Sequence, residues 1–288
     1  MFKNHLIRLT KVPIVREFVL FCYRALQALR YLSGRLWLAI RWLFESREHT
    51  NYSYDLTAAN KDYLGAFVCH ITGRPFAEVR GYIAELEQDT ELISHVQKLT
   101  AASEQRYVAD RQVRFSKRLG WYAFVRTMKP AVVVETGLDK GLGSCVIARA
   151  LQRNAQEGVR GHYYGTDINP KAGYLFSGEL AQFGTLLYGD SLESLRKLPG
   201  TIDLFINDSD HSADYECAEY ELIKNKLSPT AVVLGDNAHA TEELFKFSMK
   251  YGRGFLFFGE QPLGHWYPGG GIGASFPHLS GSRPQHTT

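Results

Sequence analysis

The chain has 288 residues, of which 45% are hydrophobic and 22% are charged. This composition excludes a disordered protein and supplies enough apolar residues for one sizeable core. The formal net charge of +3 is too small to indicate nucleic-acid binding, because phosphate recognition concentrates Lys and Arg on one face. The four cysteines are scattered without a CxxC pair, so we expect neither a disulfide framework nor a cysteine zinc site, and a reducing cytoplasm is the simplest location.

Residues 1–50 combine apolar and aromatic side chains with regularly spaced arginines. Arg24, Arg30, Arg35 and Arg41 interrupt the apolar stretch, so no run reaches the roughly 20 residues that cross a bilayer. The stretch also lacks the cleavage pattern of a signal peptide. The pattern predicts one or two basic amphipathic helices, which pack against the rest of the protein or a second copy, or lie on an anionic membrane surface. We favour packing, because apolar helical stripes more often belong to a core.

Residues 51–104 are expected to form a helical lid or oligomerisation region. The sequence TGRP predicts a break between helices, and Asp89 or Thr90 is a suitable cap for the helix that follows. A further helix is predicted over Glu104 to Met128, ending before Pro130. We expect these helices to contribute a lid, a surface for homo-oligomer formation, or both.

From Ala131 onward, short apolar strands alternate with helices. Strands that are apolar throughout and separated by helices indicate a parallel sheet covered on both faces. The predicted strands are AVVVET, HYYGTDI, TLLYGD, IDLFIND and AVVLGDN, and a helix is expected before TLLYGD. GFLFFGEQ and GGGIGASF have no helix between them, which predicts an antiparallel hairpin at the sheet edge. The fold class is therefore α/β, a doubly wound, mainly parallel seven-stranded sheet over residues 105–278, followed by a flexible tail at 279–288.

In an open parallel sheet, ligands bind beyond the carboxyl ends of the strands. The first strand is followed by a glycine-rich turn that begins at Glu135 and includes Gly137 and Gly141, and a helix begins near Ser144. Glycines let such a turn approach a ligand closely, and the helix offers its amides and the positive end of its dipole. The spacing is not the GxGxxG of classical dinucleotide enzymes.

Acidic residues end the next two strands. Asp167, in GTDINP, is placed to accept both hydroxyls of a ribose, or else to serve as a turn residue ahead of Pro170. Asp190 and Ser191, in YGDS, suit the edge of a base, and they are equally suited to capping the following helix. Both roles can hold at once.

This order of strand, glycine turn, ribose acid and GDS resembles the class I S-adenosylmethionine-dependent methyltransferases, over roughly residues 104–276. The resemblance implies a Rossmann-like methyltransferase fold that ends in an edge hairpin. It also implies S-adenosyl-L-methionine as cofactor, bound by residues at the strand ends: Glu135, Gly137, Gly141, Ser144, Asp167, Asp190 and Ser191.

The fourth and fifth strands end in further oxygen ligands. Asp208 follows one strand, and Asp236 and Asn237 follow the next. Neighbouring strands lie about 5 Å apart, so these side chains can converge. Carboxylate and amide oxygens suit Mg²⁺, and clustered carboxylates without a cation would raise one another's pKa. The sequence therefore predicts a divalent cation here.

INDSDHS resembles the FIDGDHS pattern of metal-dependent small-molecule O-methyltransferases that act on natural products and sugars. The resemblance implies that Asp208, Asp236 and Asn237 hold Mg²⁺ and that His211 is the general base, with Asp208 also catalytic. The chain departs from the pattern at Asn207, Ser209 and Asn237. Asp210 could take over as a ligand or orient His211, which could instead be a structural histidine.

Three residues near the C-terminus, His265, Trp266 and Tyr267, either border the acceptor or pack within a hairpin loop. The expected acceptor is a hydroxyl of a small molecule. Two alternatives stay open. One is a metal-independent methyltransferase with an N, C or other O acceptor. The other is a non-catalytic membrane-surface or scaffold protein that keeps the fold.

Overall fold

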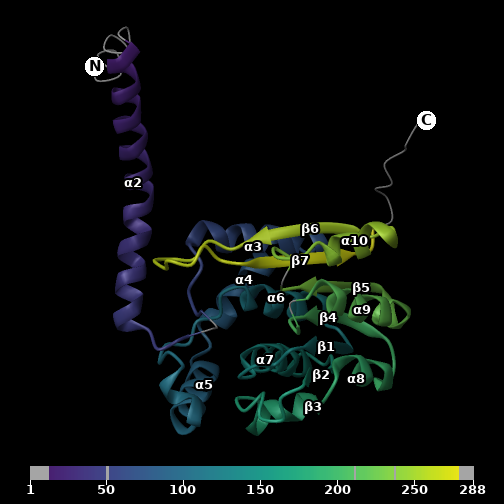
Figure 1. The fold of residues 1–288 in the computed structure, drawn as a ribbon. Helices are drawn as coiled ribbons and strands as arrows, with labels where there is room; N and C mark the ends of the chain where they lie inside the picture. The colour runs from purple at the N-terminus through teal and green to yellow at the C-terminus, as the bar shows by residue number, and fades with distance from the viewer. Residues whose placement is uncertain (1–12, 50–51, 211, 237, 279–288) are drawn as a thin grey trace, which may run out of the picture. The chain divides into compact units, whose positions relative to one another are not determined.

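The computed structural model describes residues 13–49, 52–210, 212–236 and 238–278. The chain divides into two compact units: Met1–Arg47 with Gly264–Tyr267, and Glu48–Leu263 with Pro268–Thr288 (Figure 1). The first unit contains the helix α2 (Pro13–Glu45), and the second contains the sheet and the remaining helices.

The first unit is built on α2, a single helix of 33 residues that extends about 50 Å at 1.5 Å per residue. Near its C-terminal end, an Nη of Arg41 donates a hydrogen bond to the carbonyl oxygen of Gly264 at 3.1 Å. The ring of Trp42 packs edge-on against Trp266, with 5.4 Å between the centroids. His265 also lies edge-on to Trp42. The aromatic loop residues thus contact α2. No helix in the described part of the chain is long and apolar enough to cross a membrane.

The second unit contains a seven-stranded sheet in the order β3-β2-β1-β4-β5-β7-β6. β1 to β5 are parallel, and β7 runs antiparallel to both β5 and β6. This confirms the predicted α/β fold and its edge hairpin. The strands are β1 (Val132–Thr136), β2 (His162–Asp167), β3 (Gly184–Tyr188), β4 (Ile202–Asn207), β5 (Leu227–Gly235), β6 (Gly254–Gly259) and β7 (Gly271–Phe276).

The central strands are apolar because both faces of the sheet are covered by helices. Val134, Phe205 and Val233 are fully buried and pack with Tyr220 and Leu244 from the covering helices. The helices of this unit are α3 (Ala58–Thr72), α4 (Phe76–Glu87), α5 (Thr90–Ala102), α6 (Arg118–Met128), α7 (Leu142–Gln156), α8 (Ser191–Lys197), α9 (Ala213–Ile223) and α10 (Glu243–Lys250).

Two predicted helices are wrong in part. The segment expected to be helical from Glu104 forms a 3-10 turn (Glu104–Tyr107), and α6 begins only at Arg118. Ser116 has a φ of 46°, a left-handed conformation that ends a right-handed helix. The segment before β3 is likewise a 3-10 helix, Gly178–Phe183, and it begins at a glycine with a φ of 64°.

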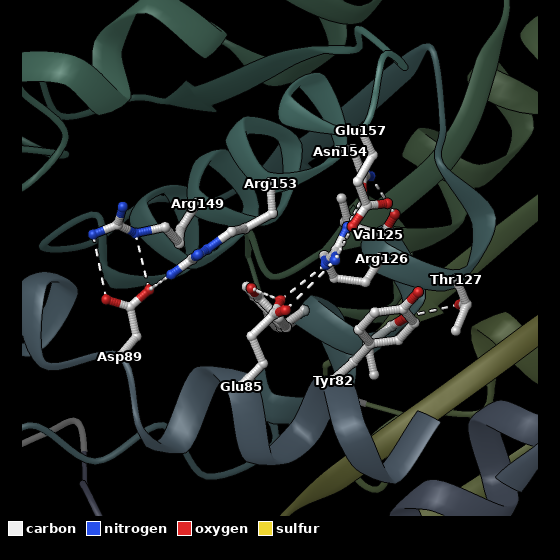
Figure 2. Close-up of polar contacts among 12 residues, drawn as sticks. Tyr82, Glu85, Asp89, Val125, Arg126, Thr127, Arg149, Arg153, Asn154 and Glu157 are labelled. Atoms are coloured by element: carbon white, nitrogen blue, oxygen red, sulfur yellow. Dashed lines mark hydrogen bonds and ion pairs between the residues drawn. The ribbon is translucent and has the colours of Figure 1, made fainter. Parts of the chain in front are cut away.

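Buried ion pairs join the N-terminal helices of the second unit to its sheet domain (Figure 2). Arg126 of α6 donates to Glu85 of α4 at 2.9 Å and to Glu157, just after α7, at 2.6 Å. The carboxylate of Asp89 caps α5 by accepting from the amide of Leu92, as predicted, and pairs with Arg149 of α7 at 3.0 Å. The helical region and the sheet are therefore parts of one compact unit.

Candidate active site

Strand register brings the predicted site residues to one edge of the sheet. Thr136, the last residue of β1, pairs with Thr166 of β2 and with Asn207 of β4, and Asn207 pairs with Gly235 of β5. The residues that follow each strand therefore emerge side by side. Residues at the ends of β1 to β4 border a pocket of about 680 Å³, whose lining includes Gly137, Asp167, Gly189, Ser191, Asp208 and Arg118.

The glycine turn after β1 is shaped by backbone packing. Gly137 has a φ of 86°, and a Cβ there would lie 1.9 Å from the carbonyl oxygen of Asp208. Gly141 has a φ of 90°, and its Cβ would lie 2.8 Å from the Cα of Gly173. Both positions thus require glycine because other backbone segments pass against them. Gly137 lines the pocket, whereas Gly141 begins α7 as its cap.

Glu135 and Ser144 lie beneath the turn rather than among the pocket-lining residues. Both are buried. The Ser144 hydroxyl is 2.8 Å from the Tyr163 hydroxyl and donates to Glu135 at 3.3 Å, and Tyr163 also donates to Glu135. Burial raises the pKa of Glu135 to about 7. These two residues hold the start of α7 against the sheet and so support the pocket from behind.

Asp167 lies in the pocket wall at the end of β2. Its Oδ2 accepts hydrogen bonds from the amides of Leu138 at 2.8 Å and Asp139 at 3.2 Å, and its Oδ1 accepts from Asn169 at 2.8 Å. The carboxylate therefore fixes the glycine turn. Because a carboxylate has about four lone-pair sites, Asp167 retains the capacity to accept from a ligand's hydroxyl groups.

Asp190 and Ser191 divide the two roles that the sequence left open. Asp190 caps α8 by accepting from the amide of Leu192 at 2.7 Å, and it also accepts from Tyr215 at 3.0 Å. Ser191 lines the pocket; its hydroxyl lies 2.8 Å from that of Tyr215 and donates to Glu219. Asp190 therefore organises the loop, and Ser191 faces the pocket.

The ends of β4 and β5 bring two carboxyl groups together. Asp208 is partly buried and lines the pocket, and Asp236 is buried. Burial and the neighbouring Asp236 carboxylate raise the pKa of Asp208 well above its usual range. Although burial favours a neutral Asp236, the Lys117 ammonium, which donates to its Oδ2, lowers the pKa of that carboxyl. Asp236 is thus the ionised member of the pair.

Two basic residues of this site were missed from the sequence. Lys117 comes from the loop before α6, where its backbone amide donates to the buried Glu260 at 2.8 Å. Arg118 lines the pocket and lies over the Trp121 ring, 5.3 Å from its centroid. Among the described residues, the Arg118 Nε has no hydrogen-bond partner. Neither residue belongs to a strand end, so no strand-based pattern could have identified them.

The described residues supply two carboxyl groups, Asp208 and Asp236, at the predicted divalent-cation site. The Oδ1 of Asp236 is buried and has no hydrogen-bond donor among the residues that the structure describes, and its Oδ2 accepts from the Lys117 ammonium. No cluster of three His, Cys, Asp or Glu side chains occurs in the described part of the chain. A full set of ligands would therefore need Asn237 or water. Asn237 and the predicted base His211 lie outside the described residues.

Part of the chain is similar to known methyltransferases. Residues 134–238 match the family model of a methyltransferase domain, whereas no curated protein matches the chain. A putative O-methyltransferase from Klebsiella pneumoniae is 16% identical, with 66% of this chain and 89% of that one covered and a TM-score of 0.47. An O-methyltransferase from Bacillus cereus, solved with SAH, is 15% identical, with coverage of 69% and 99% and a TM-score of 0.45. A methyltransferase from Geobacter sulfurreducens is 18% identical, with coverage of 67% and 95% and a TM-score of 0.48.

Proposed function

We propose that this chain, a class I S-adenosylmethionine-dependent methyltransferase through its domain at residues 134–238, transfers the methyl group to a hydroxyl oxygen of a small molecule. A sugar or natural-product intermediate is the acceptor class that we favour. The observation that carries the proposal is the convergence of Asp208 and Asp236 at the same sheet edge as the pocket lined by Gly137 and Asp167.

The cofactor is proposed to lie along the ends of β1 to β3. Asp167 would accept the ribose hydroxyls, and Ser191 would lie near the base. Arg118 supplies a cation whose Nε lacks a hydrogen-bond partner among the described residues, which suits the carboxylate of the cofactor's amino-acid part. These three residues orient the cofactor so that its methyl group faces the ends of β4 and β5.

Asp208, Asp236 and Asn237 would hold Mg²⁺ in this proposal. A bound Mg²⁺ lowers the pKa of a coordinated hydroxyl and so makes it a better nucleophile. His211 would take the hydroxyl proton, since an imidazole titrates near neutral pH. Asp208 lines the pocket and would therefore contact the acceptor side directly, whereas the buried Asp236 would fix the ligand set from below.

A second candidate is a methyltransferase that needs no metal. It is favoured by the ion pair between Lys117 and Asp236, because the chain itself then places a positive charge beside the acidic pair. In that case the acidic pair would only orient the acceptor, with Lys117 holding Asp236 ionised, and N, C or other O acceptors become possible.

Metal binding separates the two candidates without knowledge of the acceptor. Electron paramagnetic resonance would measure Mn²⁺, as a probe for Mg²⁺, bound to the SAH-saturated protein. We expect one bound Mn²⁺ in the wild type and in Asp203→Asn, and loss of binding in Asp236→Asn. Asp203 is the control because its carboxylate lies at the start of β4, away from the pocket, where it accepts the backbone amides of Ala131 and Val132. Absence of bound Mn²⁺ in the wild type would reject the metal-assisted proposal in favour of the second candidate.

A further inference from the structure

α2 presents a wide and exposed apolar face. At 100° per residue, one arc of about 180° on α2 carries only apolar side chains from Phe18 to Phe44, apart from Ser33. Five other apolar side chains project outside this arc: Leu20, Tyr23, Tyr31, Leu38 and Trp42. Phe18 is 69% exposed, Leu36 62% and Phe44 86%. A two-helix seam needs a narrower stripe than this. A surface of this width is typical of a helix that lies in a lipid interface.

The arginines of α2 all project outside this apolar arc, onto the other half of the helix. The helix contains five arginines and two glutamates, a net charge of +3, and no lysine or aspartate. Arg30 and Arg35 border the apolar arc on its two sides by the same helical projection. Their side chains are exposed, and a long arginine stem can lie along lipid while its guanidinium reaches the phosphate groups. The charge on α2 therefore complements an anionic surface.

We propose that α2 binds the surface of an anionic phospholipid bilayer, with its apolar face among the acyl chains and its arginines at the headgroups. The helix lies on the bilayer and does not cross it, in keeping with the absence of a membrane-spanning helix among the described residues. Trp37, which is 64% exposed on the apolar face, suits the boundary between headgroups and acyl chains.

A second copy of the chain is the competing occupant of this face. Antiparallel or parallel pairing of two such helices would leave part of the wide apolar arc uncovered. It would also bring the arginines that border the arc, Arg30 and Arg35, toward those of the other copy. An anionic bilayer covers the whole arc and neutralises the same arginines. The width of the arc and its charge thus both favour lipid.

Flotation of the full-length protein with vesicles tests the proposal. We expect binding to vesicles of phosphatidylcholine with phosphatidylglycerol, weak binding to phosphatidylcholine alone, and release at high salt. Leu36→Glu should lower the partition coefficient at least about tenfold, since a charge enters the apolar face. Gln27→Glu adds the same charge on the polar side of the helix and should have a much smaller effect. Circular dichroism and thermal unfolding show whether each variant is folded.

Sedimentation velocity of the same proteins distinguishes lipid binding from pairing with a second copy of the chain. Failure of the folded wild type to float with anionic vesicles would overturn the proposal. A wild-type dimer that Leu36→Glu converts to monomer, without flotation of either protein, would assign the face to self-association instead. Equal flotation of the wild type and Leu36→Glu would also contradict the lipid-binding proposal, because the apolar face would then have no part in binding.

Discussion

Arg126 is the residue whose replacement we expect to destabilise the second unit most clearly. Its side chain is 3% exposed and joins three helical segments through Glu85, Asn154 and Glu157 (Figure 2). The guanidinium also lies 4.6 Å from the centroid of the Tyr82 ring. Arg126→Met keeps much of the side-chain volume while removing all of these interactions.

The cost of Arg126→Met follows from what is left behind. Removing one partner of a buried ion pair costs about 3–5 kcal/mol, because the remaining charge stays buried. Glu85 keeps a hydrogen bond from Tyr122, and Glu157 is 41% exposed and keeps Lys129 at 2.8 Å, so we expect the lower end, about 3 kcal/mol. For a unit of this size, this corresponds to a fall in Tm of about 6–12 °C.

Differential scanning calorimetry and urea unfolding would measure this cost. Lys197→Met is the control, since its partner Glu193 lies at 3.6 Å and both side chains are mostly exposed, and such pairs contribute under about 1 kcal/mol. If Arg126→Met unfolded within the range of this control, the ion pairs would not be what joins α4 and α6 to α7, and the reasoning would fail.

Two further predictions concern the glycine turn after β1 and the buried carboxyl group beneath it. Gly137→Ala should unfold the turn and abolish SAH binding, because its Cβ would meet the backbone of Asp208 at 1.9 Å. The control Gly158→Ala has a similar φ of 88° and open space around it, so its free energy of unfolding should fall by only about 1 kcal/mol. Equal effects of the two substitutions in urea unfolding would contradict this prediction. Burial raises the pKa of Glu135 from 4.5 to about 7, so the folded state binds this proton more tightly than the unfolded state and stability falls as pH rises between those values. Glu135→Gln should therefore gain on the order of 3 kcal/mol relative to the wild type between about pH 4.5 and pH 7, and parallel pH profiles for the two proteins would refute the assignment.

Strand-end chemistry was predictable from the sequence because it is local. Apolar runs such as VVV at 132–134 predict buried parallel strands, and an acid directly after a strand must emerge at the carboxyl edge of the sheet. The strand pattern alone therefore predicts that Asp167, Asp208 and Asp236 share one edge. Asp190 could not be resolved in the same way, since capping and ligand binding use the same residue type at the same position.

The basic side of the site was not predictable, for a physical reason. Lys117 reaches Asp236 across 119 positions of sequence, from a loop whose course depends on the left-handed Ser116 and on the hydrogen bond to Glu260. Glu135 resembled a ligand residue because it begins the glycine turn, yet its side chain turns inward to Tyr163. Such pairings depend on tertiary packing and carry no short-range signal.

The pocket at the ends of β1, β2 and β4 is proposed to bind S-adenosylmethionine. Calorimetric titration with SAH tests this claim directly, using the wild type, Asp167→Ala and Asp203→Ala. Each variant removes a carboxylate that accepts two or more backbone amides. Asp167 lies at the carboxyl ends of the strands, beside the pocket, whereas Asp203 lies at their amino ends. We predict binding by the wild type, a loss of about 100-fold or more in Asp167→Ala, and unchanged affinity in Asp203→Ala. No binding by the folded wild type, or equal affinity in all three proteins, would contradict the claim.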